Sequence, residues 1–217
     1  TVAGPAVVVM NGANTYTGTT EIAAGTLNLT GSLDSRNVHI AAGATLDDVN
    51  GGLHSASTLS NDGTVNLSAD DAVSTFASTG TLNGSSYTLT AAIYALNNGS
   101  VINANLGAGV VTANGTVQLN GASGAEIVNI ASGTTTLGSA ERLLDSADVT
   151  ISSLGMLVLG GDETIGTLLG GGIVDAHSYQ LILTEGGNFS GTINNAADLI
   201  AYGSELTTQY TTCLPTA

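Results

Sequence analysis

The sequence contains no lysine and no tryptophan, and its two basic residues are Arg36 and Arg142. Against them stand 17 acidic side chains, which give the chain a formal net charge of −15. A chain with two positive charges cannot neutralise a phosphate backbone, so nucleic acid is excluded as a partner. The same net charge repels anionic lipid surfaces and anionic polysaccharides.

Proline is nearly absent as well, since it occurs only at positions 5 and 215. The sequence has no uninterrupted apolar run of about 18 residues, so we expect no helix that inserts into a membrane. No basic segment precedes an apolar one, and no signal peptide is visible. The abundance of Val, Ile and Thr argues against a disordered chain. A chain without internal proline is suited to continuous strand pairing, because every backbone N–H remains a donor.

The single cysteine, Cys213, excludes an intramolecular disulfide bond. Two interpretations of this residue stay open. It is either a solvent-facing thiol near the end of the chain or a crosslink to another chain.

A short motif recurs along the chain, in which a glycine is followed by alternating apolar and polar residues. Gly25-Thr-Leu-Asn-Leu29 is the clearest copy. The first and last glycines of the series are 166 residues apart over nine intervals, or about 18 residues per repeat. We expect glycine and asparagine at corners where φ is positive. The ten glycines are Gly25, Gly43, Gly63, Gly80, Gly99, Gly115, Gly133, Gly155, Gly172 and Gly191.

Each repeat is too small to bury its own apolar face, so neighbouring repeats must stack. Alternation within the short strands places Val, Leu and Ile inside and Thr, Asn and Ser outside. The sequence therefore predicts an all-β fold, a parallel β-helix (β-solenoid) of ten to twelve coils. We assign an N-terminal apolar strand or end contact to 1–10, the solenoid to 11–203 and a polar C-terminal tail to 204–217. The alternative fold is an antiparallel sandwich or barrel.

Two segments resemble a known family. Residues 11–29 (NGANTYTGTTEIAAGTLNL) resemble the passenger-associated repeat of autotransporter adhesins, G-x-N-x-Y-x-G-x-T-x-I-x-x-G-T-L-x-L. Residues 157–168 and 189–193 resemble β-helical regions of autotransporter and haemagglutinin-like surface proteins of Gram-negative bacteria. The resemblance implies a right-handed parallel β-helix, secreted or exposed at the bacterial cell surface. It implies no catalytic site.

The densest acidic clusters are the pairs Asp47-Asp48 and Asp70-Asp71. We expect both pairs to be solvated corners. A Ca²⁺ site and a glycosidase carboxylate pair remain weaker alternatives. Adjacent strand residues point to opposite faces, so at most one member of each pair can join a common site unless the pair lies on a corner.

The histidines, His39, His54 and His177, lack the spacing of a metal-ligand set, so we expect no metal and no cofactor. His39 alternates with apolar neighbours and should face outward. Arg36 and Arg142 lie about six coils apart and cannot share the basic site that a polysaccharide lyase needs. We expect the aromatic residues to be core plugs or corner packing; they include Tyr16, Phe76, Tyr87, Tyr94, Tyr179 and Phe189.

The function that fits these features is a non-catalytic extracellular β-solenoid for surface display, adhesion or head-to-tail filament building. The alternative is a carbohydrate-active β-helix hydrolase that uses carboxylates. Both coil ends are open strand edges, which favour pairing with another chain. The partner at these ends is a second copy or a neighbouring domain of a larger adhesin, and a host or surface glycan is a further candidate. The predicted contact residues are Val7, Val8, Val9, Met10, Leu199, Ile200, Tyr202 and Cys213.

Overall fold

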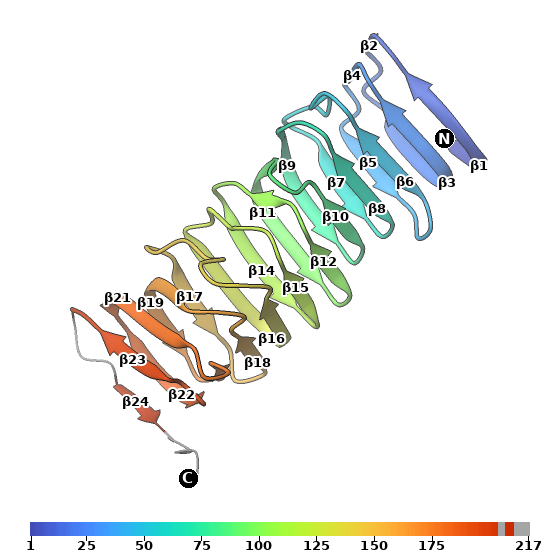
Figure 1. Ribbon diagram of the computed structural model, residues 1–217. Coiled ribbons are helices and arrows are strands. Elements are labelled where there is room, and N and C mark those ends of the chain that lie inside the picture. Colours follow the sequence, from blue (N-terminus) through green and yellow to red (C-terminus); the bar gives the residue numbers. More distant parts are fainter. Residues whose placement is uncertain (204–206, 211–217) are drawn as a thin grey trace.

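The computed structural model describes residues 1–203 and 207–210, and every regular element in this part of the chain is a β-strand. The strands stack into an elongated rod with the N-terminus at one end (Figure 1). The rod has about 11 turns, about 18 residues apart. The strand pairings found in the described residues are parallel. The predicted parallel β-solenoid is therefore confirmed, and the antiparallel alternative is wrong.

Each coil has three sides, and the long strands bend around the corner between the first two. In β3 (Thr19–Leu29), for example, the first half pairs with β5 and the second half with β6. The first side consists of the first half of β3, β5 (Asn37–Ile40), β7 (Thr58–Asn61), the second halves of β9 (Asp71–Ser78) and β11 (Thr88–Asn97), β14 (Val110–Asn114), the first half of β16 (Ile127–Leu137), β17 (Asp148–Ile151) and the second half of β19 (Glu163–Gly170).

The second side is a continuous column that runs the length of the rod. It consists of the second half of β1 (Val2–Met10), the second half of β3, β6 (Thr45–Asp48), β8 (Thr64–Leu67), β10 (Thr81–Asn83), β12 (Ser100–Ile102), β15 (Val117–Leu119), the second half of β16, β18 (Gly155–Val158), β20 (Ile173–Asp175), the second half of β22 (Asn188–Asn194) and β24 (Thr207–Tyr210). The third side is shorter and more irregular. It includes β2 (Ala13–Asn14), β4 (Ser32–Leu33), β13 (Asn105–Leu106), β21 (Gln180–Gly186) and β23 (Asp198–Ala201), with the first residues of β9, β11 and β19.

The core is a stack of inward-pointing apolar side chains, one set per coil. The inward column of the second side contains Leu27, Leu46, Val65, Leu82, Ile102 and Leu119, which are paired in register and buried. On the first side Phe76 and Tyr94 lie in register and are both fully buried. The Tyr94 hydroxyl accepts the Ala91 N–H at 2.8 Å and donates to the Leu89 carbonyl at 2.9 Å. The expected role as core plugs is confirmed for Phe76, Tyr94 and Phe189.

The periodic glycines lie at the bend between the first and second sides. The expectation that such corners require a positive φ is only partly correct. Five of the ten, including Gly63 and Gly80, do not have a positive φ. A Cβ on Gly80 would instead collide with the carbonyl oxygen of Gly63 in the preceding coil. At Gly133 both constraints apply, since φ is 70° and a Cβ would lie 2.5 Å from the carbonyl carbon of Gly115. The repeat therefore needs glycine chiefly because adjacent coils approach closely at this corner.

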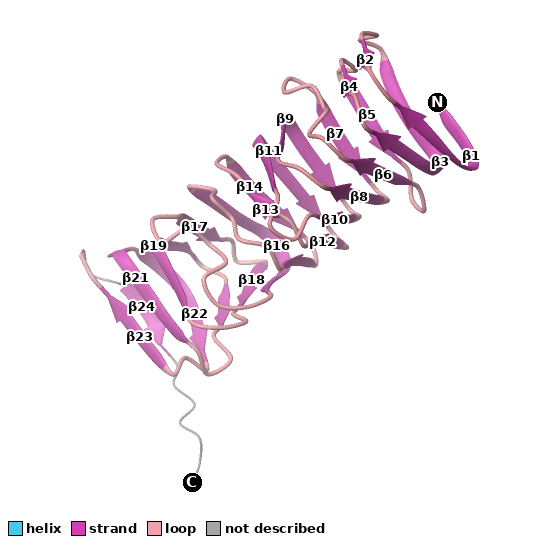
Figure 2. Ribbon diagram, turned by 45° about the horizontal axis from the view of Figure 1, so that its top comes forward, coloured by secondary structure: helices cyan, strands magenta, loops and turns pink. Residues whose placement is uncertain are grey.

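Strand pairing extends past both predicted limits of the solenoid. Within the predicted N-terminal segment, β1 pairs with β3 from Val2 opposite Ile22 to Met10 opposite Leu29. Within the predicted tail, β24 pairs with β22. Figure 2 shows β1 and β23 at opposite ends of the rod. The described residues include no helix long and apolar enough to cross a membrane.

Candidate functional site

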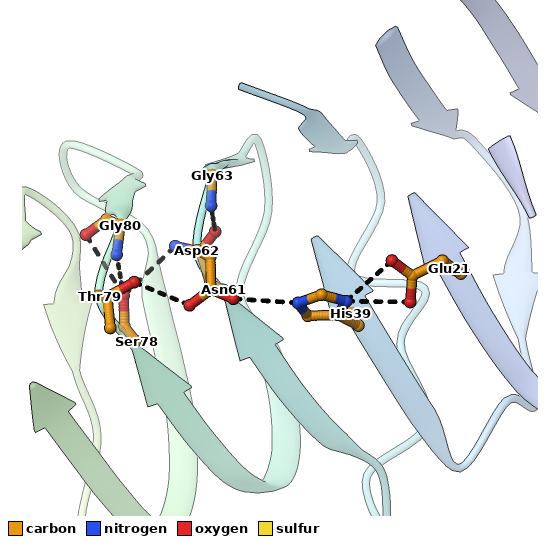
Figure 3. Close-up of polar contacts among 8 residues, drawn as sticks. All are labelled: Glu21, His39, Asn61, Asp62, Gly63, Ser78, Thr79 and Gly80. Carbon is orange, nitrogen blue, oxygen red and sulfur yellow. Dashed lines mark hydrogen bonds and ion pairs between the residues drawn. The ribbon is translucent and has the colours of Figure 1, made fainter. Parts of the chain in front are cut away.

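A column of polar side chains crosses successive coils along the outside of the first side (Figure 3). Glu21 comes from β3 and His39 from the neighbouring strand β5, directly opposite it in the pairing register. Asp62 follows β7, and Thr79 follows β9. Four successive coils thus contribute one side chain each to this cross-coil histidine cluster, which we define as Glu21, His39, Asp62 and Thr79.

His39 lies between the two carboxylates of this cluster. Its Nδ1 is 2.9 Å from both Oε1 and Oε2 of Glu21, and its Nε2 is 3.0 Å from Oδ2 of Asp62. The Thr79 hydroxyl donates to Oδ1 of Asp62 at 2.7 Å. The His39 side chain is 36% exposed, so the expectation that it faces outward is confirmed.

The two carboxylates favour the charged imidazolium. Hydrogen bonds to Asp62 and then to Glu21 raise the pKa of His39 above its usual value of 6.5. Conversely, the hydrogen bond from His39, followed by the one from Thr79, lowers the pKa of Asp62. A protonated His39 can donate to both neighbours at once and so connects three coils electrostatically.

The cluster does not have the geometry of a nucleophilic site. A nucleophilic hydroxyl must contact the base that activates it, but the Thr79 hydroxyl bonds to Asp62 and not to the imidazole. Both ring nitrogens of His39 are already engaged by carboxylates. In residues 1–203 and 207–210 no group of three or more His, Cys, Asp or Glu side chains is arranged to hold a metal ion. The cluster therefore joins successive coils through side-chain hydrogen bonds.

We expect protonation of His39 to stabilise the N-terminal coils. Because its pKa is raised in the folded chain, its contribution is complete below about pH 6.5 and is lost as the pH rises through the folded value. The partly exposed pairs are each worth about 0–1 kcal/mol. Thermal unfolding between pH 5 and pH 8 should show this contribution in the wild-type chain and lack it in His39→Gln. His177→Gln, at an exposed histidine outside the cluster, should keep the wild-type pH dependence. An unchanged dependence in His39→Gln would contradict the interpretation.

The two acidic pairs separate in the structure, and one member of each pair turns inward. Asp47 faces outward and accepts the side-chain amide of Asn66 at 2.7 Å. Asp70 accepts the backbone N–H of Thr88 at 2.8 Å. Asp48, by contrast, is fully buried (0% exposed) and contacts the carboxyl group of Asp71. The expectation of solvated corners is therefore wrong for Asp48. It lies two residues after the core residue Leu46 in the same strand, so both side chains point inward.

Backbone N–H groups surround the Asp48–Asp71 pair. The Gly52 N–H donates to Oδ1 of Asp48 at 3.0 Å. The N–H groups of Leu53 and Ala72 donate to Oδ2 and Oδ1 of Asp71 at 3.0 and 2.7 Å. Burial, together with the neighbouring Asp48, raises the pKa of Asp71 to about 8. Burial and the neighbouring carboxyl group therefore both disfavour the charged form of Asp71.

A third inward carboxyl, Glu163, was missed by the sequence analysis. It is 1% exposed and accepts the N–H groups of Arg142 and Leu143 at 3.0 and 2.7 Å. Burial, with a smaller contribution from Glu141, raises the pKa of Glu163 to about 7. The signal that could have found it is its alternation with the buried Ile165, which places both residues on the inner face.

The outer face of the second side contains a ladder of amide side chains. Each Nδ2 donates to the oxygen of the preceding rung, over distances of 2.7–2.9 Å. A column of threonines, Thr26, Thr45, Thr64 and Thr81, runs beside the ladder, and the last three lie two residues before a rung in the same strand. The predicted outward placement of Thr and Asn is confirmed here. The rungs of the ladder are Asp47, Asn66, Asn83, Asn103 and Asn120.

The predicted contact residues that the structure describes lie at the two ends of the rod. Val7 and Val9 are exposed by 63% and 56%. Val8 pairs with the core residue Leu27 and is exposed by 39%. At the other end Leu199 and Ile200 are half-buried in β23, and Tyr202 is exposed. Met10 is half-buried, and Cys213 lies outside the described residues.

Comparison with known proteins identifies a family repeat at the N-terminal end. The family model of the passenger-associated-transport-repeat matches residues 1–29, which form β1, β2 and β3. This match confirms the resemblance read from residues 11–29. No curated protein and no solved structure matches the chain.

Proposed function

Because residues 1–29 carry a passenger-associated-transport-repeat, we propose that this chain is a passenger-like structural β-solenoid that acts outside the bacterial cell as a stiff rod for display or adhesion. The observation that carries the proposal is the unbroken second side, in which strand pairing continues from β1 to β24. Such a column transmits load along the rod, because every coil is hydrogen-bonded to the next.

The use of polar side chains supports a structural role. The amide ladder and the cross-coil histidine cluster join one coil to another. The inward carboxyl groups of Asp71 and Glu163 accept backbone N–H groups. A glycosidase needs two carboxyl groups that flank a sugar, at least about 5 Å apart. The two aspartates that the fold brings together contact each other, and Asp48 is fully buried. This geometry favours the non-catalytic function over the hydrolase.

The display function can be tested by placing the chain, with an N-terminal epitope, between a secretion signal and an outer-membrane translocator. We expect the epitope to reach the cell surface, where added protease removes it while the rod resists digestion. Retention of the epitope inside the cell, or digestion of the rod together with it, would contradict the proposal. Release of reducing sugars from neutral polysaccharides by the purified chain, abolished in Glu21→Gln, would favour the hydrolase instead.

We further propose end-to-end association through the exposed strand β1 and the opposite end of a second copy. Heterologous contacts of this kind build open filaments. Light scattering and negative-stain microscopy over a range of concentrations should show rods that lengthen end to end. Val9→Lys should block lengthening, because a charge on an edge strand opposes pairing, whereas Cys213→Ser should reveal whether a disulfide bond reinforces the joint. A wild-type chain that stays monomeric at every concentration would contradict this proposal and leave the rod function intact.

A further inference from the structure

We propose that Asp48 and Asp71 share a single proton in the folded rod, and that this proton keeps the corner 49–53 in place. We call the protonated pair the latch. The two residues are 23 positions apart in the sequence. Asp48 ends β6 on the second side, and Asp71 begins β9 on the third side. The latch therefore connects two sides of the solenoid across its interior.

The hydrogen-bond pattern shows where the proton is needed. Three of the four carboxyl oxygens in the pair accept a backbone N–H, from Gly52, Leu53 and Ala72. The fourth oxygen, Oδ2 of Asp48, is buried and has no donor. Two carboxylate oxygens cannot hydrogen-bond to each other unless one of them carries a proton. A proton shared between this oxygen and the carboxyl group of Asp71 supplies the missing hydrogen bond.

Among the residues that the structure describes, no positive charge contributes to the raised pKa of Asp71. Asp48 is flanked in the pairing register by Leu29 and Leu67, and Asp71 by Leu89. Within the described part of the chain, Asp48 is the charged neighbour that raises the pKa of Asp71. The neighbouring ionisable groups are engaged elsewhere: Asp47 with Asn66, Asp70 with the Thr88 N–H, and Arg36 with His54. A proton fits this site better than Ca²⁺, which takes about 6–8 oxygen ligands, more than the four carboxyl oxygens of the pair can supply.

The latch holds a corner that contributes to the core. Leu53 is buried and pairs with Leu33, whose N–H donates to the Gly52 carbonyl at 2.8 Å. Both carboxyl groups bond directly to this corner, through Gly52 and Leu53. Loss of the proton would leave two like charges in contact in an apolar interior, which is strongly unfavourable. Deprotonation should therefore loosen the corner and expose Leu53.

The direction of the pH dependence follows from the raised pKa of Asp71, about 8 when folded against about 3.9 when unfolded. Between these values the folded chain holds one more proton than the unfolded chain. The contribution of the pair to stability should therefore be greatest near pH 4, fall as the pH rises, and level off above about pH 8. For one proton the folding equilibrium constant changes by about tenfold per pH unit in this window.

Two conservative variants test the shared proton. In Asp48→Asn the new amide can still accept the Gly52 N–H and can donate to Asp71, as the protonated acid does. We expect this variant to lose the pH dependence of the latch and to melt at a higher temperature than wild type at pH 9. In Asp71→Asn the amide nitrogen must face the N–H of Leu53 or Ala72, so we expect lower stability than wild type at pH 5. Asp145→Asn removes the same charge from an exposed loop residue and should keep the wild-type pH dependence.

A direct titration keeps the proposal testable even if Asp71→Asn does not fold. Carboxyl-carbon NMR of the wild-type chain should show one group of the Asp48–Asp71 pair titrating near pH 8, accompanied by faster hydrogen exchange of the Gly52 and Leu53 amides after correction for intrinsic rates. Titration of both groups below pH 5, or an unchanged pH dependence in Asp48→Asn, would overturn the proposal. Calcium chloride that raises the melting temperature of wild type at pH 9, but not that of Asp48→Asn, would also overturn it and identify a cation site.

Discussion

Replacing Phe76 with alanine should lower the free energy of unfolding by about 3–5 kcal/mol, the usual cost of truncating a fully buried phenylalanine. The ring is completely buried and lies in register between Leu59 in the preceding coil and Tyr94 in the following one. The backbone hydrogen bonds of three consecutive coils fix these positions, so the neighbours cannot collapse into the cavity. Far-UV circular dichroism during urea unfolding would measure the loss.

The matched control for this variant is Tyr87→Ala, which truncates an aromatic side chain that is 40% exposed. We expect its cost to stay near 0.5 kcal/mol, as for other surface positions. Solenoids can unfold in parts, so hydrogen exchange should locate the first effect of Phe76→Ala in β7, β9 and β11. Equal losses in the two variants would show that the core does not depend on this stack.

The second large effect is expected at the periodic glycines, and three alanine variants separate its two causes. Gly43→Ala introduces only backbone strain, since φ is 80° and no atom lies within 4 Å of the new Cβ. Gly80→Ala introduces only a collision with the preceding coil. Gly133→Ala introduces both. Left-handed φ costs about 1–2 kcal/mol and overpacking about 1–3 kcal/mol, so Gly133→Ala should be the most destabilising of the three.

Thermal unfolding of the three variants would rank these costs. We expect Gly80→Ala to destabilise the chain although its φ is ordinary, because backbone atoms of the neighbouring coil cannot move aside without breaking the strand ladder. A neutral Gly80→Ala combined with a costly Gly43→Ala would show that positive φ alone explains the repeat, and that the close approach of the coils is relaxed in solution.

The sequence by itself determined the architecture of this protein. Alternating strands of the Gly25-Thr-Leu-Asn-Leu29 type, repeated about every 18 residues without internal proline, favour burial of their apolar faces by parallel stacking over an antiparallel sandwich or barrel. The same local pattern predicted the inward leucines and the outward Thr and Asn columns, because alternation on a strand depends on nothing beyond the strand itself. The match of residues 1–29 to a passenger-associated-transport-repeat agrees with this local information.

Only the tertiary structure decided which polar groups meet. The pairing of Asp48 with Asp71, and the position of His39 between Glu21 and Asp62, depend on how far the chain advances at each corner. The intervals between the repeat glycines vary from 16 to 22 residues, so the register of one coil on the next cannot be calculated from a fixed period. The strand pattern is a local property, whereas cross-coil contacts are set by corner geometry and by the packing of adjacent backbones. For this reason the sequence predicted the rod, and the structure alone revealed its buried carboxyl pair.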